Sequence, residues 1–450
     1  MRKVDLNIVN AKILVEQNLI DAGVSVDHGR IVKVAKLPNL PNSDETVDSK
    51  NMLMIPGVVD IHVHLRDLDF SYKEDFSSGT QAAIMGGVTT VLDMPNTSPP
   101  TINAERLKDK MDKATSMIYS NVGFFGALSL EPKETSMMAR VGAIGFKLYL
   151  NDAQYSPLID RELSVRVLKP VESSRVPLSV HAEFPQKPMS KGEEQDTKSE
   201  IEFFKRAHDP KTEADAVSMC LRMAKDSGTH IHVCHLSTES ALNLIDNAKL
   251  ARLPVSAEVT PHHLLLSDKE LGDFGSYAKM VPPLRTARDA ESLMRGLTRG
   301  IVDVIASDHA PHTIEEKRQR FIDAPSGIPG LETMLPLVLT EMLEGRITLK
   351  RVIQSFSETP SRLFKLDGRG KIAEGYNADL VLVDLHAEKR IEAQAFHSKA
   401  KYTPFEGRIV RGIPVLTVVN GIQVMRDGEI LGRAGDGQLI RKINSKSEQE

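Results

Sequence analysis

Two histidines separated by a single residue are the first feature of this sequence that could do chemistry. His62 and His64 lie at the end of an apolar run, GVVDIHVHL. Side chains at positions i and i+2 of a strand share one face, so both imidazoles can point at one ion. Taken alone, the pair fits two hydrogen-bonded core histidines better than a metal site. However, His181, His235 and Asp308 also stand at the ends of apolar runs, and the whole set favours a metal. Neutral imidazole together with carboxylate suits Zn²⁺.

Lys147 lies within another apolar run, IGFKLYL. A buried ammonium group would be costly there, whereas a lysine near the strand end could extend its amine to solvent. Alternatively, the neutral amine could react with CO₂ and form a carbamate, an anion whose two oxygens could bridge two zinc ions. Nearby metal ions would favour the neutral amine that this reaction needs. The residues alone leave both interpretations open.

Asp308 lies in ASDHAPHT, with two histidines close behind it. A carboxylate that contacts both a metal and a bound water can transfer a proton, so we predict Asp308 as the catalytic residue. A helix N-cap or a surface ion pair is the weaker interpretation at a strand end. His309 is expected to orient Asp308, and His312 is better placed to reach a substrate. For each histidine alone, a solvated loop position fits equally well.

Arg66 and Asn96 are candidates for binding a substrate anion. Arg66 follows the histidine pair by two residues and so points the same way as His64. An arginine at the mouth of a zinc site can bind a carboxylate bidentately, although an ion pair with Asp67 or Asp69 explains it equally well. Asn96, in MPNT, is a weaker candidate donor to the same anion.

Cys234 and Glu258 define a possible third metal position. Cys234 is next to His235, so on a strand the two side chains would point to opposite faces. If His235 faces the main site, Cys234 is expected to face away as a small buried hydrophobe. Glu258 lies at a comparable height in the next apolar run, where an unpaired carboxylate would be costly. A twist or bulge at the strand end could bring Cys234 to Glu258, and the two could then hold another zinc.

These side chains need a scaffold that brings the ends of several apolar runs together. Helical stretches such as INAERLKDKMDKAT separate the runs, which are GVVDIHVHL (57–65), GVTTVLDMP (87–95), NVGFFGAL (121–128), IGFKLYL (144–150), VPLSVHAE (176–183), HIHVCHLS (230–237), VSAEVTPHH (255–263) and VDVIASDHA (302–310). Eight strands alternating with helices predict an α/β fold, a (β/α)8 TIM-type barrel, with a doubly wound open sheet as the alternative. The C-terminal strand ends of such a barrel surround one mouth, where the candidate residues would meet.

The two ends of the chain have a different pattern, with short strands separated by Gly and Asp-Gly turns. We predict that residues 1–55 and 370–440 form one small β domain. Residues 56–369 would then form the catalytic barrel, and residues 441–450 a tail.

The composition argues against several classes of function. A net charge of −4 and the absence of Trp are unlike a nucleic-acid-binding surface. The longest apolar runs are too short to span a membrane and the first residues lack a long apolar segment, so we expect neither a membrane span nor a signal peptide. The only cysteines, Cys220 and Cys234, fit a reducing compartment. We therefore expect a soluble, cytoplasmic protein that acts on a small molecule, with a homo-oligomer left open.

Longer segments of the chain resemble the dihydroorotases of the amidohydrolase superfamily. They include DIHVHLRDLDF, GFKLYLN, SVHAE, HVCHLST, AEVTPHHLLLS, SDHAPHTIEEK and FHSKAKYTPFEG. The superfamily shares only the ligand scaffold, whereas HLRD, SDHAPHTIEEK and SKAKYTPFEG point more specifically to dihydroorotase. The family usually has HLREPG where this chain has HLRDLDF, so a different loop after Arg66 is expected.

The resemblance implies a (β/α)8 barrel with a small β domain from both termini, and two zinc ions per chain. One zinc is implied to bind His62, His64, Lys147 and Asp308. The other is implied to bind Lys147, His181 and His235, with Lys147 carboxylated by CO₂. The substrate carboxylate is implied to contact Arg66, Asn96 and His312.

The implied activity is the reversible cyclisation of N-carbamoyl-L-aspartate to dihydroorotate, a step of pyrimidine synthesis. One alternative is another cyclic amidase, such as a hydantoinase, dihydropyrimidinase or allantoinase, which would less often carry the arginine after the histidine pair. The other is a non-catalytic amidohydrolase-like scaffold protein. Such a protein is expected to lose metal ligands, and none is lost in this sequence.

Overall fold

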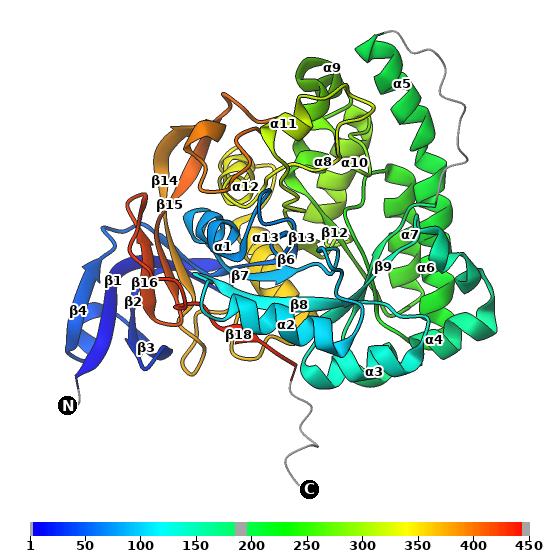
Figure 1. Cartoon of the computed structure of the whole chain (residues 1–450). Helices are drawn as coiled ribbons and strands as arrows, with labels where there is room; N and C mark the ends of the chain where they lie inside the picture. Colours follow the sequence, from blue (N-terminus) through cyan, green and yellow to red (C-terminus); the bar gives the residue numbers. More distant parts are fainter. Residues whose placement is uncertain (1–2, 185–195, 443–450) are drawn as a thin grey trace, which may run out of the picture.

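Eight parallel strands form a barrel at the centre of the molecule (Figure 1). The computed structural model describes residues 3–184 and 196–442. The barrel strands are β6 (Val58–Val63), β7 (Val88–Asp93), β8 (Asn121–Ala127), β9 (Gly145–Tyr149), β10 (Leu178–His181), β11 (Ile231–Val233), β12 (Val255–Val259) and β13 (Val304–Ile305). Each strand lies in one of the eight apolar runs and pairs in parallel with the next strand along the chain. The predicted (β/α)8 barrel is confirmed.

The barrel closes where the end of β6 meets the segment that follows β13. Val63 and His309 form a parallel bridge, and the His64 backbone N–H donates to the His309 carbonyl at 2.8 Å. The buried Asp60 carboxylate accepts hydrogen bonds from the backbone N–H groups of His62, at 3.2 Å, and Ser307, at 3.1 Å. This closure brings the histidine pair next to the Asp308 segment.

Helices surround the barrel. They are α1 (Phe76–Met85), α2 (Ala104–Ala114), α3 (Pro132–Val141), α4 (Arg161–Ser174), α5 (Thr197–Ala207), α6 (Pro210–Ser227), α7 (Glu239–Leu250), α8 (Pro261–Leu265), α9 (Lys269–Phe274), α10 (Ala287–Thr298), α11 (Ile314–Lys317), α12 (Met334–Leu343), α13 (Leu349–Ile353) and α14 (Thr359–Leu363). Short polar side chains begin many of them, because their oxygens accept a backbone N–H that the first helical turn leaves unpaired. Asn103, Asp160 and Thr238 each accept the N–H three residues further on.

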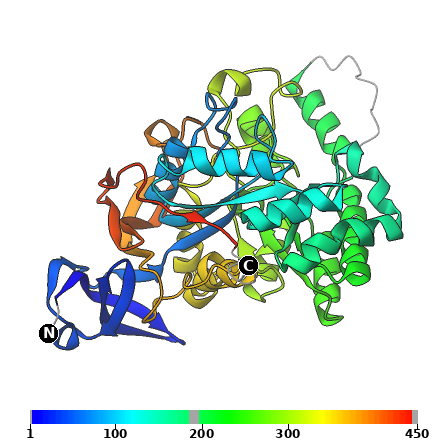
Figure 2. The same cartoon turned by 60° about the horizontal axis from the view of Figure 1, so that its bottom comes forward.

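A second sheet contains strands from both ends of the chain, as the sequence predicted. Its members are β1 (Val4–Val15), β2 (Asn18–Asp27), β3 (Arg30–Ala35), β4 (Ser43–Asp48), β5 (Leu53–Pro56), β14 (Leu380–Arg390), β15 (Ile409–Val419), β16 (Ile422–Arg426) and β17 (Glu429–Ile430). The antiparallel pairing of β5 with β14 joins the two ends of the chain. Figure 2 shows this sheet at one side of the barrel, with the N-terminal strands projecting furthest.

The last described strand does not belong to that sheet but to the barrel sheet. β18 (Leu439–Ile440) pairs in parallel with Val122 and Gly123 at the start of β8. The chain can approach there because Gly437 has no side chain, and a Cβ at that position would lie 2.1 Å from the Ser120 carbonyl oxygen. Residues 439–440, which the sequence assigned to the small β domain, therefore contact the barrel. The division into domains otherwise remains a prediction, and residues 443–450 of the expected tail lie outside the described part of the chain.

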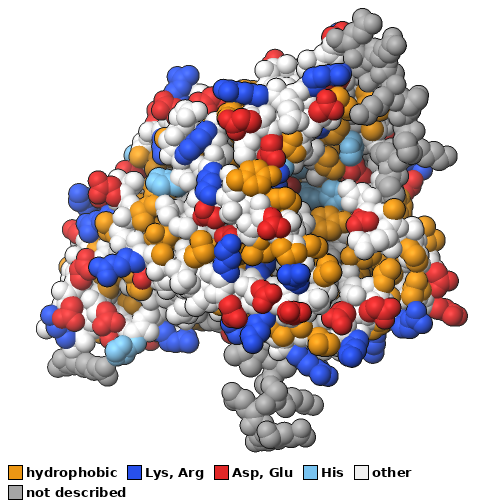
Figure 3. Space-filling view, in the orientation of Figure 1, with side chains coloured by type: hydrophobic (Ala, Val, Ile, Leu, Met, Phe, Trp, Pro, Cys, Tyr) orange, Lys and Arg blue, Asp and Glu red, His pale blue; other side chains and the backbone are white. Residues whose placement is uncertain are grey.

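The surface carries charges of both signs. Acidic and basic side chains are interspersed over the face seen in Figure 3, and histidines are visible in a hollow of it. Within the described ranges, none of the helices combines the length and the apolar character needed to cross a membrane.

Candidate metal centre

The histidine pair on β6 presents two ring nitrogens to the same carboxylate oxygen. His62 Nε2 lies 3.3 Å and His64 Nε2 lies 3.2 Å from Asp308 Oδ1. The opposite ring nitrogens are occupied, because His62 Nδ1 donates to Glu258 and His64 Nδ1 donates to Asn96 Oδ1, at 2.6 Å. A neutral imidazole carries one N–H, so both Nε2 atoms turn a lone pair toward Asp308. Such outer hydrogen bonds orient histidines for metal binding in proteins.

If His62 and His64 are both neutral, their two Nε2 lone pairs face the Asp308 carboxylate, and such a group of acceptors requires a cation, either a proton or a metal ion. Burial and the Lys147 amine oppose protonation of His62, but the Glu258 and Asp308 carboxylates outweigh them and raise its pKa to about 10. The spacing also suits a metal, because tetrahedral ligands with bonds of about 2.0 Å to zinc lie about 3.3 Å apart. The separations from Asp308 Oδ1, 3.3 Å and 3.2 Å, match that value. The cluster therefore has the donor types of a zinc site, and both measured separations from Asp308 fit one. His235 also offers a ring nitrogen within 4.8 Å of ligand atoms of His62 and Asp308.

Asp308 is held in this position by an unusual backbone conformation. It follows β13 with a φ of 47°, in the left-handed region that residues other than glycine rarely adopt. Burial opposes ionisation of its carboxyl group, but the neighbouring His62 and His64 outweigh burial and hold its pKa well below the usual value. Asp308 is therefore a carboxylate that faces the cluster.

His181 and His235 form the second half of the centre. His181 ends β10, and His235 follows β11, with 3.0 Å between His181 Nδ1 and His235 Nε2. Burial lowers the pKa of both imidazoles, so both are neutral. The remaining ring nitrogens, His181 Nε2 and His235 Nδ1, are buried and have no hydrogen-bond partner among the described residues. Two close nitrogens on neutral rings can bind one metal ion.

Lys147 lies between the two halves of the centre. Its side chain is fully buried, with Nζ 3.3 Å from His62 Nε2 and 3.0 Å from Cys234 Sγ. In the described part of the chain, no carboxylate forms an ion pair with this amine. The expectation that Lys147 could extend to solvent is wrong, because β9 places it inside the barrel.

The expectation that Cys234 faces away from the centre is also wrong. Alternation of faces holds only within a strand, and β11 ends at Val233, one residue before Cys234. The chain then turns through His235, whose φ is 36°. Cys234 Sγ consequently faces Lys147, on the same side as the histidines.

Glu258, on β12, is buried but well paired. One oxygen accepts from His62 Nδ1 and from the His235 backbone N–H at 3.2 Å, and the other lies 3.0 Å from His232 Nε2. Burial opposes its charge, but His62 and the hydrogen bond from His232 hold its pKa well below the usual value. The sequence indicated that an unpaired carboxylate would be costly here, and the structure supplies protein partners rather than requiring a metal. Glu258 orients His62, a role that the sequence did not reveal, although the run HIHVCHLS contained its partner His232.

The three predicted anion-binding residues lie beside the cluster. Arg66 has a φ of 59°, and its Nε donates to the Pro311 carbonyl at 3.1 Å. Its Nη2 lies 3.1 Å from His312 Nε2. Burial and the charges of Arg66 and Lys73 lower the pKa of His312 to about 2, so the ring is neutral. Asn96 uses its side-chain oxygen to hold His64, as described above.

His309 does not orient Asp308 through its side chain. Its ring points away from the centre, where Nδ1 accepts the Gly330 N–H at 3.1 Å and Nε2 lies 3.6 Å from Glu74. The expected role is wrong because His309 continues the β13 line and closes the barrel through its backbone. The sequence did not reveal Glu183, which contacts the candidate ligand His181. It lies two positions after His181, with an oxygen 3.6 Å from His181 Nε2 and hydrogen bonds to His208.

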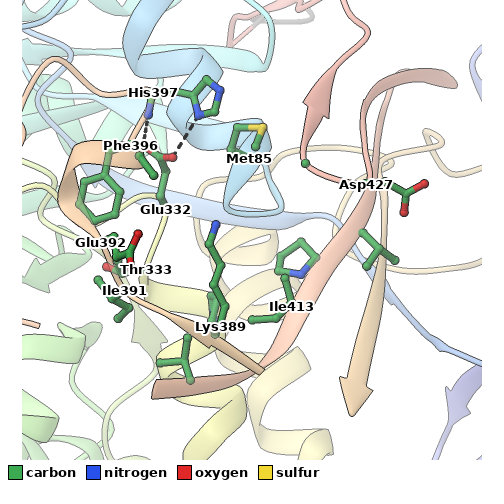
Figure 4. A pocket seen from close by; sticks show the side chains of 16 residues that line it. Met85, Glu332, Thr333, Lys389, Ile391, Glu392, Phe396, His397, Ile413 and Asp427 are labelled. Carbon is green, nitrogen blue, oxygen red and sulfur yellow. Dashed lines mark hydrogen bonds and ion pairs between the residues drawn. The ribbon is translucent and has the colours of Figure 1, made fainter. Parts of the chain in front are cut away.

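A separate pocket of about 500 Å³ lies between α12 and the strands β14 and β15 (Figure 4). None of the predicted site residues lines it. Glu332, in its wall, accepts the backbone N–H groups of His397 at 2.7 Å and Ser398 at 3.1 Å. Ser398 in turn donates to Glu74, which lies beside His309. The pocket is therefore connected through Ser398 and Glu74 to His309, which closes the barrel, and is not part of the metal centre.

The chain is similar to known proteins over almost its whole length. The model of the amidohydrolase family matches residues 53–424. The dihydroorotase of Methanothermobacter thermautotrophicus is 37% identical over 436 residues, which cover 97% of each chain. The dihydroorotase of Pyrococcus horikoshii is 34% identical over 99% of this chain and 98% of its own length. The solved L-hydantoinase (dihydropyrimidinase) from Arthrobacter aurescens superposes with a TM-score of 0.88 and 28% identity, over 97% of this chain and 100% of the other.

We expect Glu258→Gln to weaken metal binding, because the amide no longer attracts the Nδ1 proton of His62 as strongly. Loss of such an outer partner typically lowers metal affinity about 10- to 100-fold. Competition with a chelator, followed by metal analysis, measures the change. Glu341→Gln is the matched control, since Glu341 is equally buried but pairs with Arg346 and Arg408. Equal affinity in Glu258→Gln and the wild type would contradict the role of Glu258.

Proposed function

Because the chain belongs to the amidohydrolase family, we propose that it catalyses the dihydroorotase reaction, the interconversion of dihydroorotate and N-carbamoyl-L-aspartate. The observation that carries the proposal is the position of Arg66 and His312 side by side next to the candidate metal ligands, with 3.1 Å between Nη2 and Nε2. A guanidinium at this place can bind the carboxylate of dihydroorotate, which hydantoins and dihydropyrimidines lack. The similarity to dihydroorotases over the full length supports the same conclusion.

We assign two zinc ions to the cluster. The first would be held by His62, His64, Asp308 and a carboxylated Lys147. The second would be held by His181, His235 and the other oxygen of the same carboxylated lysine. The neutral imidazoles and the paired lone pairs described above support this assignment. When bound, zinc ions supply a Lewis acid for a carbonyl oxygen and lower the pKa of water.

Asp308 is the group that moves the proton. In the hydrolytic direction it accepts a proton from the water that attacks the ring carbonyl between C5 and N3. It then donates this proton to N3 as the bond between the carbonyl carbon and N3 breaks. This leaves the free ureido group and a new carboxyl group, whose own proton is released to solvent. In cyclisation the same steps run backwards. Arg66, His312 and the Asn96 amide hold the other carboxylate of the substrate so that the reacting carbonyl stays beside Asp308.

A related cyclic amidase is the second candidate, because the solved hydantoinase has the same fold. Hydantoinase or dihydropyrimidinase activity would leave Arg66 without an anion to bind. A non-catalytic scaffold protein is a poorer candidate, since no candidate ligand is missing and His62, His235 and Asp308 lie within 4.8 Å of one another.

The deciding experiment compares substrates and then removes Arg66. We expect turnover of dihydroorotate and N-carbamoyl-L-aspartate, with little activity on hydantoin or dihydrouracil. Arg66→Ala should lose about 2–4 kcal/mol of substrate binding, seen mainly in KM, because a charged partner is left unpaired. Arg66→Lys should recover little, since the planar fork is lost.

The control for that experiment is Arg161→Ala, which removes an exposed arginine that pairs with Asp226. It should leave the kinetics unchanged. Preference for an uncharged cyclic amide, together with wild-type kinetics for Arg66→Ala, would rule out the dihydroorotase proposal.

We also propose that CO₂ carboxylates Lys147. The support is a fully buried amine that lies 3.3 Å from a candidate ligand, His62 Nε2. The amine nitrogen bonds to the carbon of CO₂ and releases one proton. Protein stripped of metal and CO₂ should then need bicarbonate as well as zinc to regain full activity.

Variants of Lys147 separate this proposal from a purely structural role. Lys147→Ala should lose most activity and regain part of it with short carboxylic acids, which can occupy the vacated space. Lys147→Met is the control, because its side chain fills that space and should prevent rescue. Full reactivation by zinc without bicarbonate would contradict carboxylation.

A third ion is a separate proposal. His62, Cys234 and Glu258 each offer one atom within 4.8 Å of the others. Binding there must displace the hydrogen bond between His62 and Glu258, so this ion should bind more weakly than the other two. Metal analysis at saturating zinc should give three ions per chain in the wild type and two in Cys234→Ser. An unchanged count in Cys234→Ser would exclude the third position.

A further inference from the structure

Two buried lysines hold the loop that follows α11. Lys317 ends α11, and Lys279 lies in the segment after the short helix Gly275–Ala278. Lys317 is fully buried and Lys279 is 5% exposed. Within the described part of the chain, neither forms an ion pair with a carboxylate. Burying two ammonium groups without acidic partners is costly unless other acceptors surround them.

Main-chain carbonyls are those acceptors. Lys279 Nζ donates to the carbonyls of Phe321, at 2.6 Å, Ile322, at 3.1 Å, and Ala324, at 2.6 Å. An ammonium group has three N–H donors, so every donor of Lys279 is satisfied. The rings of Phe204 and Phe321 also face this nitrogen, at 5.3 Å and 5.1 Å from their centroids.

Lys317 holds the next part of the loop in the same way. Its Nζ donates to the carbonyls of Pro325, at 2.9 Å, Gly327, at 3.0 Å, and Lys279, at 3.4 Å. The Tyr402 hydroxyl also donates to the Gly327 carbonyl, at 3.0 Å. The two cations therefore turn the carbonyls on both sides of residue 326 inward.

The Ser326 carbonyl, between those carbonyls, points instead at the substrate-binding histidine. It lies 3.1 Å from His312 Nε2 and accepts no other hydrogen bond from the described residues. The other ring nitrogen, Nδ1, lies 3.3 Å from Lys73 Nζ and 3.3 Å from Glu316 Oε2. A neutral ring has only one N–H, so these contacts cannot all be made at once.

The partners of His312 distinguish its two tautomers. With the proton on Nε2, the ring donates to Ser326 and accepts from Lys73. With the proton on Nδ1, it donates to Glu316, accepts from Arg66 and leaves the Ser326 carbonyl without a partner. Glu316 does not need that proton, because it already pairs with Lys73 at 2.8 Å and accepts the Thr313 N–H at 3.1 Å. The fixed carbonyl of Ser326 therefore favours the Nε2–H tautomer. In this form two N–H donors, His312 Nε2 and Arg66 Nη2, lie 3.1 Å apart, an unfavourable contact that an anion bound between them would relieve.

We propose that Lys279 and Lys317 are positioning residues of the substrate-anchoring group, because they fix the Ser326 carbonyl and so the protonated nitrogen of His312. In this tautomer His312 presents an N–H beside Arg66 Nη2, and Arg66 keeps its own N–H free. A carboxylate that enters between them can then accept from Arg66 and share the His312 N–H with the Ser326 carbonyl. This step rests on the proposed function, whereas the tautomer itself does not.

The tautomer can be measured directly in the metal-loaded protein without substrate. Protonated and unprotonated ring nitrogens differ in their ¹⁵N NMR shifts, and His312→Gln identifies the signals that belong to His312. We expect Nε2 to carry the proton in the wild type. In Lys317→Met, part of the population should shift to the Nδ1–H form. A wild-type ring protonated on Nδ1 would overturn the proposal.

Kinetics provide the second measurement. The assays are run on the acid side of the Lys317 pKa, which burial and the charge of Lys279 lower to about 7. Lys317→Met and Lys279→Met should each raise KM for dihydroorotate about tenfold, with kcat within about twofold of the wild type. Lys249→Met is the matched control. Lys249 also bonds a backbone carbonyl, that of Ile301 at 2.7 Å, but at the opposite end of the barrel. It should leave KM and the His312 tautomer unchanged.

Two further outcomes keep the test decisive. If the lysine variants do not fold, His312→Gln should bind substrate better than His312→Asn, because the glutamine amide places its N–H near the Nε2 position. The reverse order would overturn the proposal.

Absence of dihydroorotate turnover combined with an Nε2–H ring would refute only the proposed function. Unchanged tautomer and KM in folded Lys317→Met and Lys279→Met would refute only the role of the lysines.

Discussion

The structure of the barrel mouth depends on three hydrogen-bond acceptors that face one another without a donor between them. His62 Nε2 and His64 Nε2 both face Asp308 Oδ1, and the protons that could have separated them are on the far side of each ring. In a buried site such a group of acceptors is unfavourable until a cation joins it. The carboxylates of Glu258 and Asp308 outweigh burial and raise the pKa of His62 to about 10. The raised pKa shows the affinity of this site for one cation, the proton. A metal ion can bind the Nε2 atoms while the Nδ1 hydrogen bonds of His62 to Glu258 and of His64 to Asn96 stay in place.

Hydrogen-bond acceptors around the site determine which ring nitrogen of each histidine carries the proton. Glu258 and Asn96 do this for the metal-facing pair, and the Ser326 carbonyl does it for His312. In each case the deciding acceptor belongs to a different strand end or loop from the histidine that it orients. The barrel therefore contributes more than proximity, because its loops set the direction of the lone pairs and N–H groups in the site.

The sequence pattern predicted best where the physical rule is local. Strand periodicity placed His62 and His64 on one face, and apolar runs identified all eight barrel strands. The same rule misplaced Cys234, because β11 ends one residue before it and His235 takes a φ of 36°. It could not identify the partners of Glu258, because His62 and the His235 backbone come from other parts of the chain. A left-handed turn and a contact between distant strands leave no periodic signal in a sequence.

By itself, the sequence determined the fold class, the residues at the strand ends and the resemblance that indicates their chemistry. These follow from residue type, apolar periodicity and motif spacing, which are properties of short segments. Only the tertiary structure decided that Lys147 is buried beside Cys234, that His309 points away from the centre and that Lys279 and Lys317 hold one loop. Those outcomes depend on which side chains meet across the barrel after it closes. The direction of a hydrogen bond there is set by partners up to hundreds of residues away along the chain.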